Sequence, residues 1–167
     1  KSEVDAAFKY ATDKGVILFH SAGNSSLDND GGKTSYPNSY IADGFGVLQV
    51  NSISNWIEVG ASTKDLGLDL VAKFSNYGNE AVSLFSPGHK IYSTTPGNKY
   101  EAFSGTSMAG PVAAGVAALL LSEFPTMTTS EAMDIIIHTV SKPEGLLVRR
   151  PSPDRRNPDF RIPVGFS

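Results

Sequence analysis

The 167-residue sequence contains no cysteine. This absence excludes disulfide bonds and thiolate metal sites. It leaves the cellular compartment open, because a secreted domain with an adequate core folds without disulfides. With 40% hydrophobic residues, the chain is long enough to bury one core, so we expect one globular domain or a large part of one.

The sequence also lacks a strong excess of charge of either sign. Fourteen Lys and Arg residues stand against seventeen Asp and Glu residues, which gives a net charge of −3. This balance of charges creates no electrostatic field that would hold a polyanion, so we expect no nucleic-acid partner. No apolar run approaches the roughly 20 residues of a membrane span, and the opening KSEVDAAFKY has no signal-peptide pattern. We therefore expect no membrane span, and any targeting segment would lie outside this sequence.

The first quarter of the sequence predicts an α/β fold. Residues 2–14 place apolar side chains at helical spacing, and Gly15 follows where a left-handed helix stop is expected. The next run, GVILFHSAGN, is short and apolar, as is typical of a strand buried on both faces. A helix that leads into such a strand indicates a mostly parallel sheet with helices on both sides.

The remaining segments continue this pattern. We expect a loop at 25–38, strands at 56–63 and 82–85, and a hairpin at 91–105. Residues 107–123 are apolar all round, which predicts a central buried helix. A second helix is expected near Thr128, which has capping-box spacing to Glu131. Residues 148–167 carry five Arg and four Pro, so we expect an irregular, solvated end.

Ser107 lies in GTSMAGP, where the hairpin runs into the apolar helix. Its hydroxyl has two roles open to it: an N-cap for the helix or a nucleophile. A serine is a weak nucleophile that needs a base and donors for the developing oxyanion. Asn24 follows the carboxyl end of the expected strand, where α/β sheets gather their sites. Its NH₂ group and the Ser107 backbone N–H, aided by the helix dipole, are candidate donors.

Over most of its length, the sequence resembles the subtilisin-like serine proteases, or subtilases. GTSMAGP is similar to that family's nucleophile motif, and SAGN at 21–24 is similar to its oxyanion-asparagine motif. Five further segments keep the family's order between the two motifs: Tyr36-Pro37, Val59-Gly60-Ala61, Phe74-Ser75-Asn76-Tyr77-Gly78, Ser86-Pro87-Gly88 and Ser93-Thr94-Thr95-Pro96-Gly97.

The resemblance implies a fold and an activity. The fold would be part of a three-layer α/β domain with a mostly parallel central sheet flanked by helices. The activity would be that of a serine endopeptidase that cleaves peptide or protein substrates through an acyl-enzyme on Ser107, with Asn24 as oxyanion donor. Ser21, Ala22 and Gly23 would bind substrate. A secreted or cell-surface location and no required cofactor are also implied.

The rest of the family's catalytic triad is missing from this sequence. In subtilisin the triad runs Asp, His, Ser along the chain, and neither the Asp motif nor the His-Gly-Thr-His motif occurs here. We expect a structural or pocket-lining role for His20, a turn position for His89 and a flank position for His138. Residues 1–167 would thus be the carboxyl-terminal half of the catalytic domain, inactive without the amino-terminal half.

Two other functions are weighed against this one. A pseudoprotease or binding module on the same fold would also lack Asp and His, and a His-Gly-Thr-His motif in the full-length protein would exclude it. An α/β-hydrolase requires G-x-S-x-G, which GTSMA fails at its fifth position. That fold also needs an acid and a histidine well downstream, and here Asp134 and His138 lie only four residues apart.

A metal ion and a second copy of the chain are the remaining partners to consider. Many subtilases bind calcium, and Asp28, Asn29 and Asp30 offer oxygen ligands, but the spacing of an EF-hand loop is absent. We therefore expect a solvated loop and assign no metal site. Without an amino-terminal half, the strand VILF and the apolar helix would be uncovered, so we expect the isolated chain to self-associate.

Overall fold

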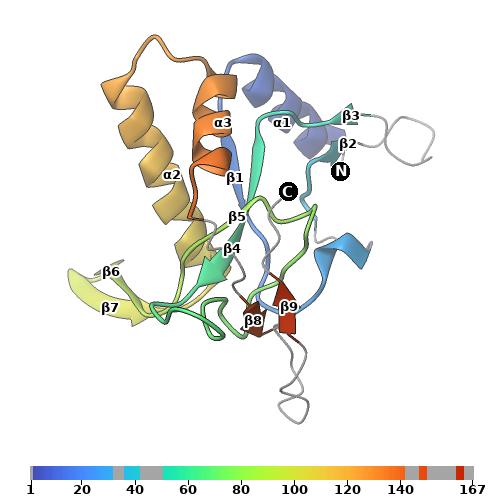
Figure 1. The fold of residues 1–167 in the computed structure, drawn as a ribbon. Coiled ribbons are helices and arrows are strands. Elements are labelled where there is room, and N and C mark those ends of the chain that lie inside the picture. The colour runs from blue at the N-terminus through green and yellow to red at the C-terminus, as the bar shows by residue number, and fades with distance from the viewer. Residues whose placement is uncertain (1, 32–35, 42–50, 142–146, 150–160, 164–167) are drawn as a thin grey trace.

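A three-stranded parallel sheet forms the centre of the computed structural model, which describes residues 2–31, 36–41, 51–141, 147–149 and 161–163. The strands are β1 (Leu18–Ser21), β4 (Trp56–Ser62) and β5 (Leu84–Pro87), in the order β1-β4-β5 (Figure 1). Both neighbouring pairs are parallel. The expected α/β fold with a parallel sheet is therefore confirmed.

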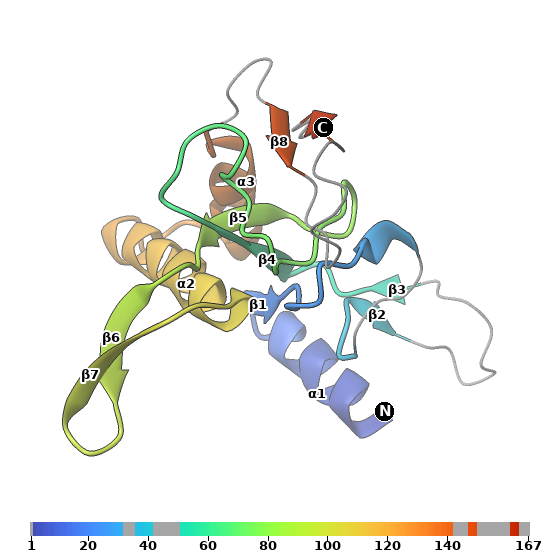
Figure 2. The ribbon, with the colours of Figure 1, turned by 90° about the horizontal axis from the view of Figure 1, so that it is seen from below.

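Helices cover both faces of this sheet. Helix α1 (Ser2–Asp13) lies on one side, and α2 (Thr106–Glu123) and α3 (Thr129–His138) lie on the other (Figures 1 and 2). The three layers match the architecture that the sequence predicts.

Two helix boundaries follow the expected chemistry. After α1, Gly15 adopts a φ of 75° and stops the helix. Before α3, Thr128 and Glu131 form the predicted capping box, in which the Thr128 side chain accepts from the Glu131 backbone N–H. In return, the Thr128 backbone N–H and hydroxyl donate to the Glu131 carboxylate, and these hydrogen bonds hold its pKa below the usual value.

The hydrophobic core lies between the sheet and the α2–α3 layer. Side chains of β4 and β5 meet small residues of α2 and larger residues of α3: Ile57, Val59, Ala61, Leu84, Ala109, Ala113, Ala117, Met133 and Ile136. The alanines on the inner face of α2 allow the helix to approach the strands closely. As a result, the first turn of α2 lies against the carboxyl ends of the strands.

Two elements are less buried than the sequence predicts. All four residues of β1 are only half-buried, because β1 is an edge strand with β4 as its single partner among the described strands. On α2, Val116 and Leu119 are 53% and 74% exposed. The expectation of a strand buried on both faces and of a fully buried helix was therefore wrong for the described residues. Apolar composition gives no information about which neighbours are present.

Three two-stranded pairs surround the central sheet. They are β2 (Tyr40–Ile41) with β3 (Asn51–Ser52), β6 (Ile91–Thr95) with β7 (Lys99–Phe103), and β8 (Leu147–Arg149) with β9 (Arg161–Pro163). The β6–β7 pair is the predicted hairpin, and it projects away from the body of the molecule (Figure 2). The end from 148 onward is not irregular throughout, because β8 and β9 pair within it. A 3-10 helix (Asn29–Gly31) interrupts the expected loop after β1.

Within the described part of the chain, α2 is the one helix that is long and apolar enough to cross a membrane. Core helices of soluble proteins satisfy the same criterion. The inner face of α2 packs against β1, β4, β5 and α3.

Gly88 connects the end of β5 to the start of α2 through backbone hydrogen bonds. Its backbone N–H donates to Ser62 and its carbonyl accepts from the Gly105 N–H, at 3.0 and 2.8 Å. A Cβ atom at this position would lie 2.7 Å from the Ala61 Cβ and 2.8 Å from the Gly105 carbonyl oxygen. Such contacts require the backbone to shift.

We therefore predict that Gly88→Ala lowers the free energy of unfolding by about 1–3 kcal/mol, as overpacking of a filled site does. Gly115→Ala is the matched control, because a Cβ there meets nothing within 4 Å and alanine favours a helix by up to about 1 kcal/mol. Urea denaturation of the two variants measures both effects. Equal stability of Gly88→Ala and the unmodified chain would contradict the predicted packing.

Candidate active site

Ser107 is the second residue of α2, and its side chain is exposed. The N-cap of this helix is Gly105, which has extended backbone and makes no side-chain cap hydrogen bond. The structure therefore excludes the N-cap role that the sequence left open for Ser107. Its hydroxyl has no hydrogen-bond partner among the described residues, so it is free to face a ligand.

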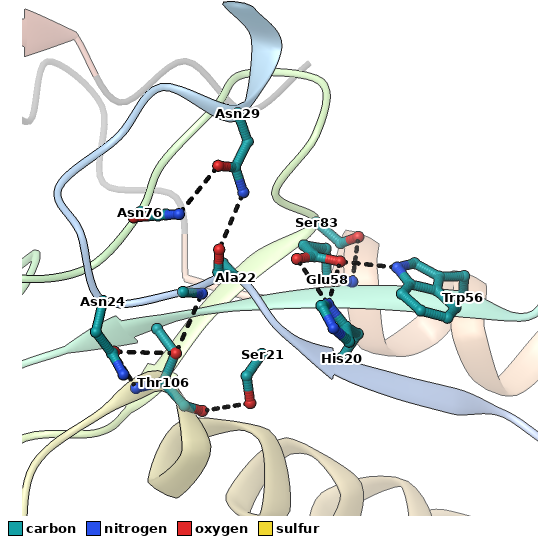
Figure 3. A network of polar contacts seen from close by, with 11 residues as sticks. His20, Ser21, Ala22, Asn24, Asn29, Trp56, Glu58, Asn76, Ser83 and Thr106 are labelled. Carbon is teal, nitrogen blue, oxygen red and sulfur yellow. Dashed lines mark hydrogen bonds and ion pairs between the residues drawn. The ribbon is translucent and has the colours of Figure 1, made fainter. Parts of the chain in front are cut away.

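Asn24 is held against the start of α2 by its neighbour Thr106. Its Oδ1 accepts from the Thr106 backbone N–H at 2.9 Å and from the Thr106 hydroxyl at 3.0 Å (Figure 3). A backbone N–H only donates, so the oxygen of the amide must face Thr106 and the NH₂ group must point away from it. No described residue accepts a hydrogen bond from this NH₂ group. Asn24 therefore presents an oriented, unused donor.

Thr106 also ties the end of β1 to the helix. Its hydroxyl accepts from the Gly23 backbone N–H at 3.2 Å, and its carbonyl accepts from the Ser21 hydroxyl at 3.0 Å. Thr106 is almost completely buried, so water does not compete for these hydrogen bonds. Through this one residue, the loop that bears Asn24 and the helix that bears Ser107 are joined.

The first turn of α2 leaves one backbone donor free. The Thr106 N–H is bound to Asn24, and those of Met108 and Ala109 donate to the Gly105 carbonyl. Within the described ranges, the Ser107 N–H has no acceptor. It lies at the positive end of an 18-residue helix, where the helix dipole favours negative charge. The free donors of Ser107 and Asn24 therefore flank the same helix terminus.

Free N–H donors beside an exposed hydroxyl are the groups that an oxyanion hole requires. Comparison with known proteins shows the family. The model of the Subtilase family matches residues 1–159. The chain belongs to the subtilase family.

The relatives of this subtilase chain are serine proteases of subtilisin type. It is 38% identical to subtilisin-like protease 2 of Plasmodium falciparum over 133 residues, which cover 77% of this chain and 9% of the relative. It is 34% identical to subtilisin DY of Bacillus licheniformis over 139 residues, or 81% of this chain and 44% of the relative.

A solved structure gives the same result for the fold. The crystal structure of a cold-adapted subtilisin-like serine proteinase superposes with a TM-score of 0.63 at 31% identity. The match covers 81% of this chain and 42% of the other. These comparisons confirm the predicted family and the subtilisin-like fold. The chain spans less than half the length of each of these relatives.

The three residues expected to bind substrate have different surroundings. Ser21 and Gly23 are half-exposed beside Thr106, whereas the side chain of Ala22 is fully buried. The Ala22 N–H donates to Val59 and its carbonyl accepts from Asn29, at 3.0 and 3.1 Å. Substrate binding by this subtilase segment remains a prediction, and for Ala22 any effect would be indirect.

His20 lies on the other face of β1 from the active site. Successive strand residues point to opposite faces, so Ser21 reaches α2 while His20 lies with Glu58 and Trp56 (Figure 3). The His20 Nδ1 is 3.0 Å from both Glu58 carboxylate oxygens, and the Trp56 indole N–H donates to the same carboxylate at 2.8 Å. The His20 ring also stacks on Trp56 at 4.9 Å. The histidine therefore has a structural role.

The sequence analysis did not identify Glu58 as the partner of His20. Glu58 lies opposite His20 in the parallel register of β1 and β4, and it is a charged residue within the apolar run WIEVGAS. A carboxylate in such a run needs a partner once buried, and that requirement was the available signal. The indole of Trp56 also packs edge-on against Phe8 of α1 and so joins the pair to that helix.

The two other histidines also make no hydrogen bond to Ser107. His89 is exposed in the turn after β5, and the exposed His138 pairs with the carbonyl of Asp134 at 2.9 Å. All three histidines of the sequence lie in described segments, and no hydrogen bond joins any of them to Ser107. Ser107 therefore has no hydrogen-bonded histidine in this chain.

The loop considered for calcium uses its oxygens within the protein. The Asp30 carboxylate accepts from the backbone amides of Asn79, Glu80 and Ala81, and Asn29 Oδ1 accepts from Asn76. Across the described ranges, no three His, Cys, Asp or Glu residues gather as metal ligands. As arranged, these oxygens stabilise the loop after β1.

Proposed function

We propose that this chain supplies the nucleophile and the oxyanion hole of a subtilisin-type serine endopeptidase. The observation that supports the proposal is the pairing of an exposed Ser107 with two unused donors, its own N–H and the oriented NH₂ group of Asn24. Family membership supports peptide bonds as the target. Similarity to subtilisins also supports a secreted or cell-surface location, which is part of the proposal.

The proposed reaction follows from these groups. The Ser107 hydroxyl attacks the scissile carbonyl carbon, and a histidine from the amino-terminal part of the domain takes its proton. Negative charge moves to the carbonyl oxygen, which accepts from Asn24 Nδ2 and the Ser107 N–H. Collapse expels the amine, protonated by the same histidine, and leaves an acyl-enzyme that water hydrolyses. Ser21 and Gly23, beside the site, are the proposed substrate contacts, and the reaction requires no cofactor.

The decisive test is Asn24→Ala in the complete catalytic domain, in which this chain is joined to the part that bears the family's aspartate and histidine. We predict that kcat falls by about 10²–10³ with little change in KM, the loss known from subtilisin itself for one oxyanion donor. Initial rates with a fluorogenic peptide measure both constants, and Ser107→Ala is the inactive control. A rise in KM alone would assign Asn24 to substrate binding instead.

The purified 167-residue chain is expected to show no protease turnover, because Ser107 has no base. Any residual rate would come from the oxyanion hole and binding alone. A panel of fluorogenic peptides, assayed with and without an added amino-terminal part of the domain, measures this. Robust turnover by the chain alone that disappears in Ser107→Ala would contradict the proposal that the base comes from another part of the domain. A pseudoprotease would remain inactive even in the complete domain.

We also propose a partner surface made of the open edge of β1 and the outer face of α2. The edge strand presents unpaired backbone groups, and Val116 and Leu119 lie three residues apart on the exposed side of the helix. The chain spans 42% of the matched proteinase, so the natural occupant is the amino-terminal half of the domain. When that half is absent, a second copy of this chain is the available cover.

We accordingly predict that the isolated chain forms a closed dimer at micromolar concentration. Leu119→Glu is expected to weaken the dimer at least about tenfold, since a charge would be buried in the contact. Leu66→Glu is the matched control, because Leu66 is 92% exposed and lies in the loop after β4, outside both elements of the proposed surface. Sedimentation velocity measures the three proteins. A monomer at all concentrations, without binding of a hydrophobic dye, contradicts the proposal.

A further inference from the structure

Asn76 connects the loop after β1 to the segment that precedes β5. It is only 4% exposed, and its side-chain Oδ1 accepts from the backbone N–H groups of Ser25 and Leu27 at 2.9 and 3.1 Å. Its own backbone N–H donates to the Gly23 carbonyl at 2.8 Å. Asn76 thus binds the residue before Asn24 and the residue after it.

A second amide extends this contact. Asn76 Nδ2 donates to Asn29 Oδ1 at 3.1 Å, and Asn29 Nδ2 donates to the Ala22 carbonyl at 3.1 Å (Figure 3). Backbone N–H groups only donate, so Ser25 and Leu27 determine which end of the Asn76 amide is oxygen. The NH₂ end must then face Asn29, and this in turn orients the Asn29 amide toward Ala22. The hydrogen bonds form one relay with a single consistent direction.

The relay leaves little freedom to the backbone around Asn24. Gly23 adopts a φ of 107°, which side-chain-bearing residues rarely adopt, and a Cβ there would lie 2.6 Å from Asn76 Nδ2. The buried Asn76 amide therefore packs directly on the backbone of Gly23. Thr106 orients the Asn24 side chain from one side, while Asn76 holds its backbone from the other.

We propose that Asn76, supported by Asn29, is a positioning residue that fixes Asn24 for its oxyanion role. The inference rests on the proposed function, because it assigns Asn76 an effect exerted through Asn24. Loss of the Asn76 amide would free the Ser25 and Leu27 N–H groups and allow the loop to move. Displacements of about 1 Å at a reacting centre are enough to cost large factors in rate. The segment Phe74–Gly78 carried family resemblance in the sequence, without a role for its asparagine.

The test is a double-mutant comparison in the complete catalytic domain. We expect Asn76→Ala to lower kcat at least about tenfold with KM unchanged within about twofold, because a transition-state donor is misplaced. In an Asn24→Ala background, the same substitution should lower kcat less than about twofold, since the donor it positions is already gone. A purely structural residue would lower kcat equally in both backgrounds, and that result would overturn the proposal.

Three further variants keep the experiment decisive. Asn76→Asp retains an acceptor for Ser25 and Leu27 and should recover part of the lost kcat. Asn29→Ala removes only the outer link and, should Asn76→Ala not fold, is expected to show the same dependence on Asn24. Asn79→Ala is the matched control in the same segment, where an exposed side chain makes no hydrogen bond within the described structure, and should leave kcat unchanged.

The two proposals fail in different ways. Full activity in Ser107→Ala would reject the proposed function whatever Asn76 does. Activity that depends on Ser107 and Asn24, together with a kcat of Asn76→Ala equal to that of the unmodified domain, would reject only the positioning role. Asn76→Asp separates the two parts of the relay, because it keeps the acceptor for Ser25 and Leu27 but removes the donor to Asn29.

Discussion

The two hydrogen bonds from Thr106 to Asn24 are the interaction on which the candidate site depends. They join residues 82 positions apart in the chain and bring the end of β1 onto the first turn of α2. Because they occupy the amide oxygen, the amide nitrogen is oriented without any ligand present. Asn24 is therefore more than a turn residue, because its amide oxygen binds Thr106 while its NH₂ group stays available as a donor. The close approach also requires Gly88 behind the helix start, where a methyl group would not fit.

The alternation of β1 divides the chemistry between two faces of the sheet. Ser21 faces α2 and donates to the Thr106 carbonyl, whereas His20, one residue earlier, lies on the opposite face and pairs with Glu58. Glu58 is 8% exposed, and a buried carboxylate needs hydrogen-bond partners. The Trp56 indole N–H donates to it in addition to its contact with His20. A histidine next to the active-site motif in sequence is thus separated from Ser107 by the sheet itself.

The sequence allowed the short-range features of this structure to be predicted, and the long-range ones only where a motif carried them. The capping box of α3, the stop after α1 and the β6–β7 hairpin depend on neighbouring residues, and all three are present. The pairing of His20 with Glu58 and of Asn29 with Asn76 spans 38 and 47 residues, so it depends on strand register and loop path, which composition does not encode. The burial of β1 and α2 was overestimated because apolar residues indicate that an element is covered, not which segment covers it.

The hydrogen bonds that orient Asn24 come from described residues of this chain. Thr106 binds the Asn24 side chain, and Asn76 binds the backbone on both sides of Asn24, with Asn29 as its outer link. These contacts are buried or half-buried, so their geometry does not depend on what later covers the outer face of α2. Under the proposed function, a base from the amino-terminal part of the domain would complete the site by adding a proton acceptor to donors that are already oriented, which is the preorganisation that electrostatic catalysis requires.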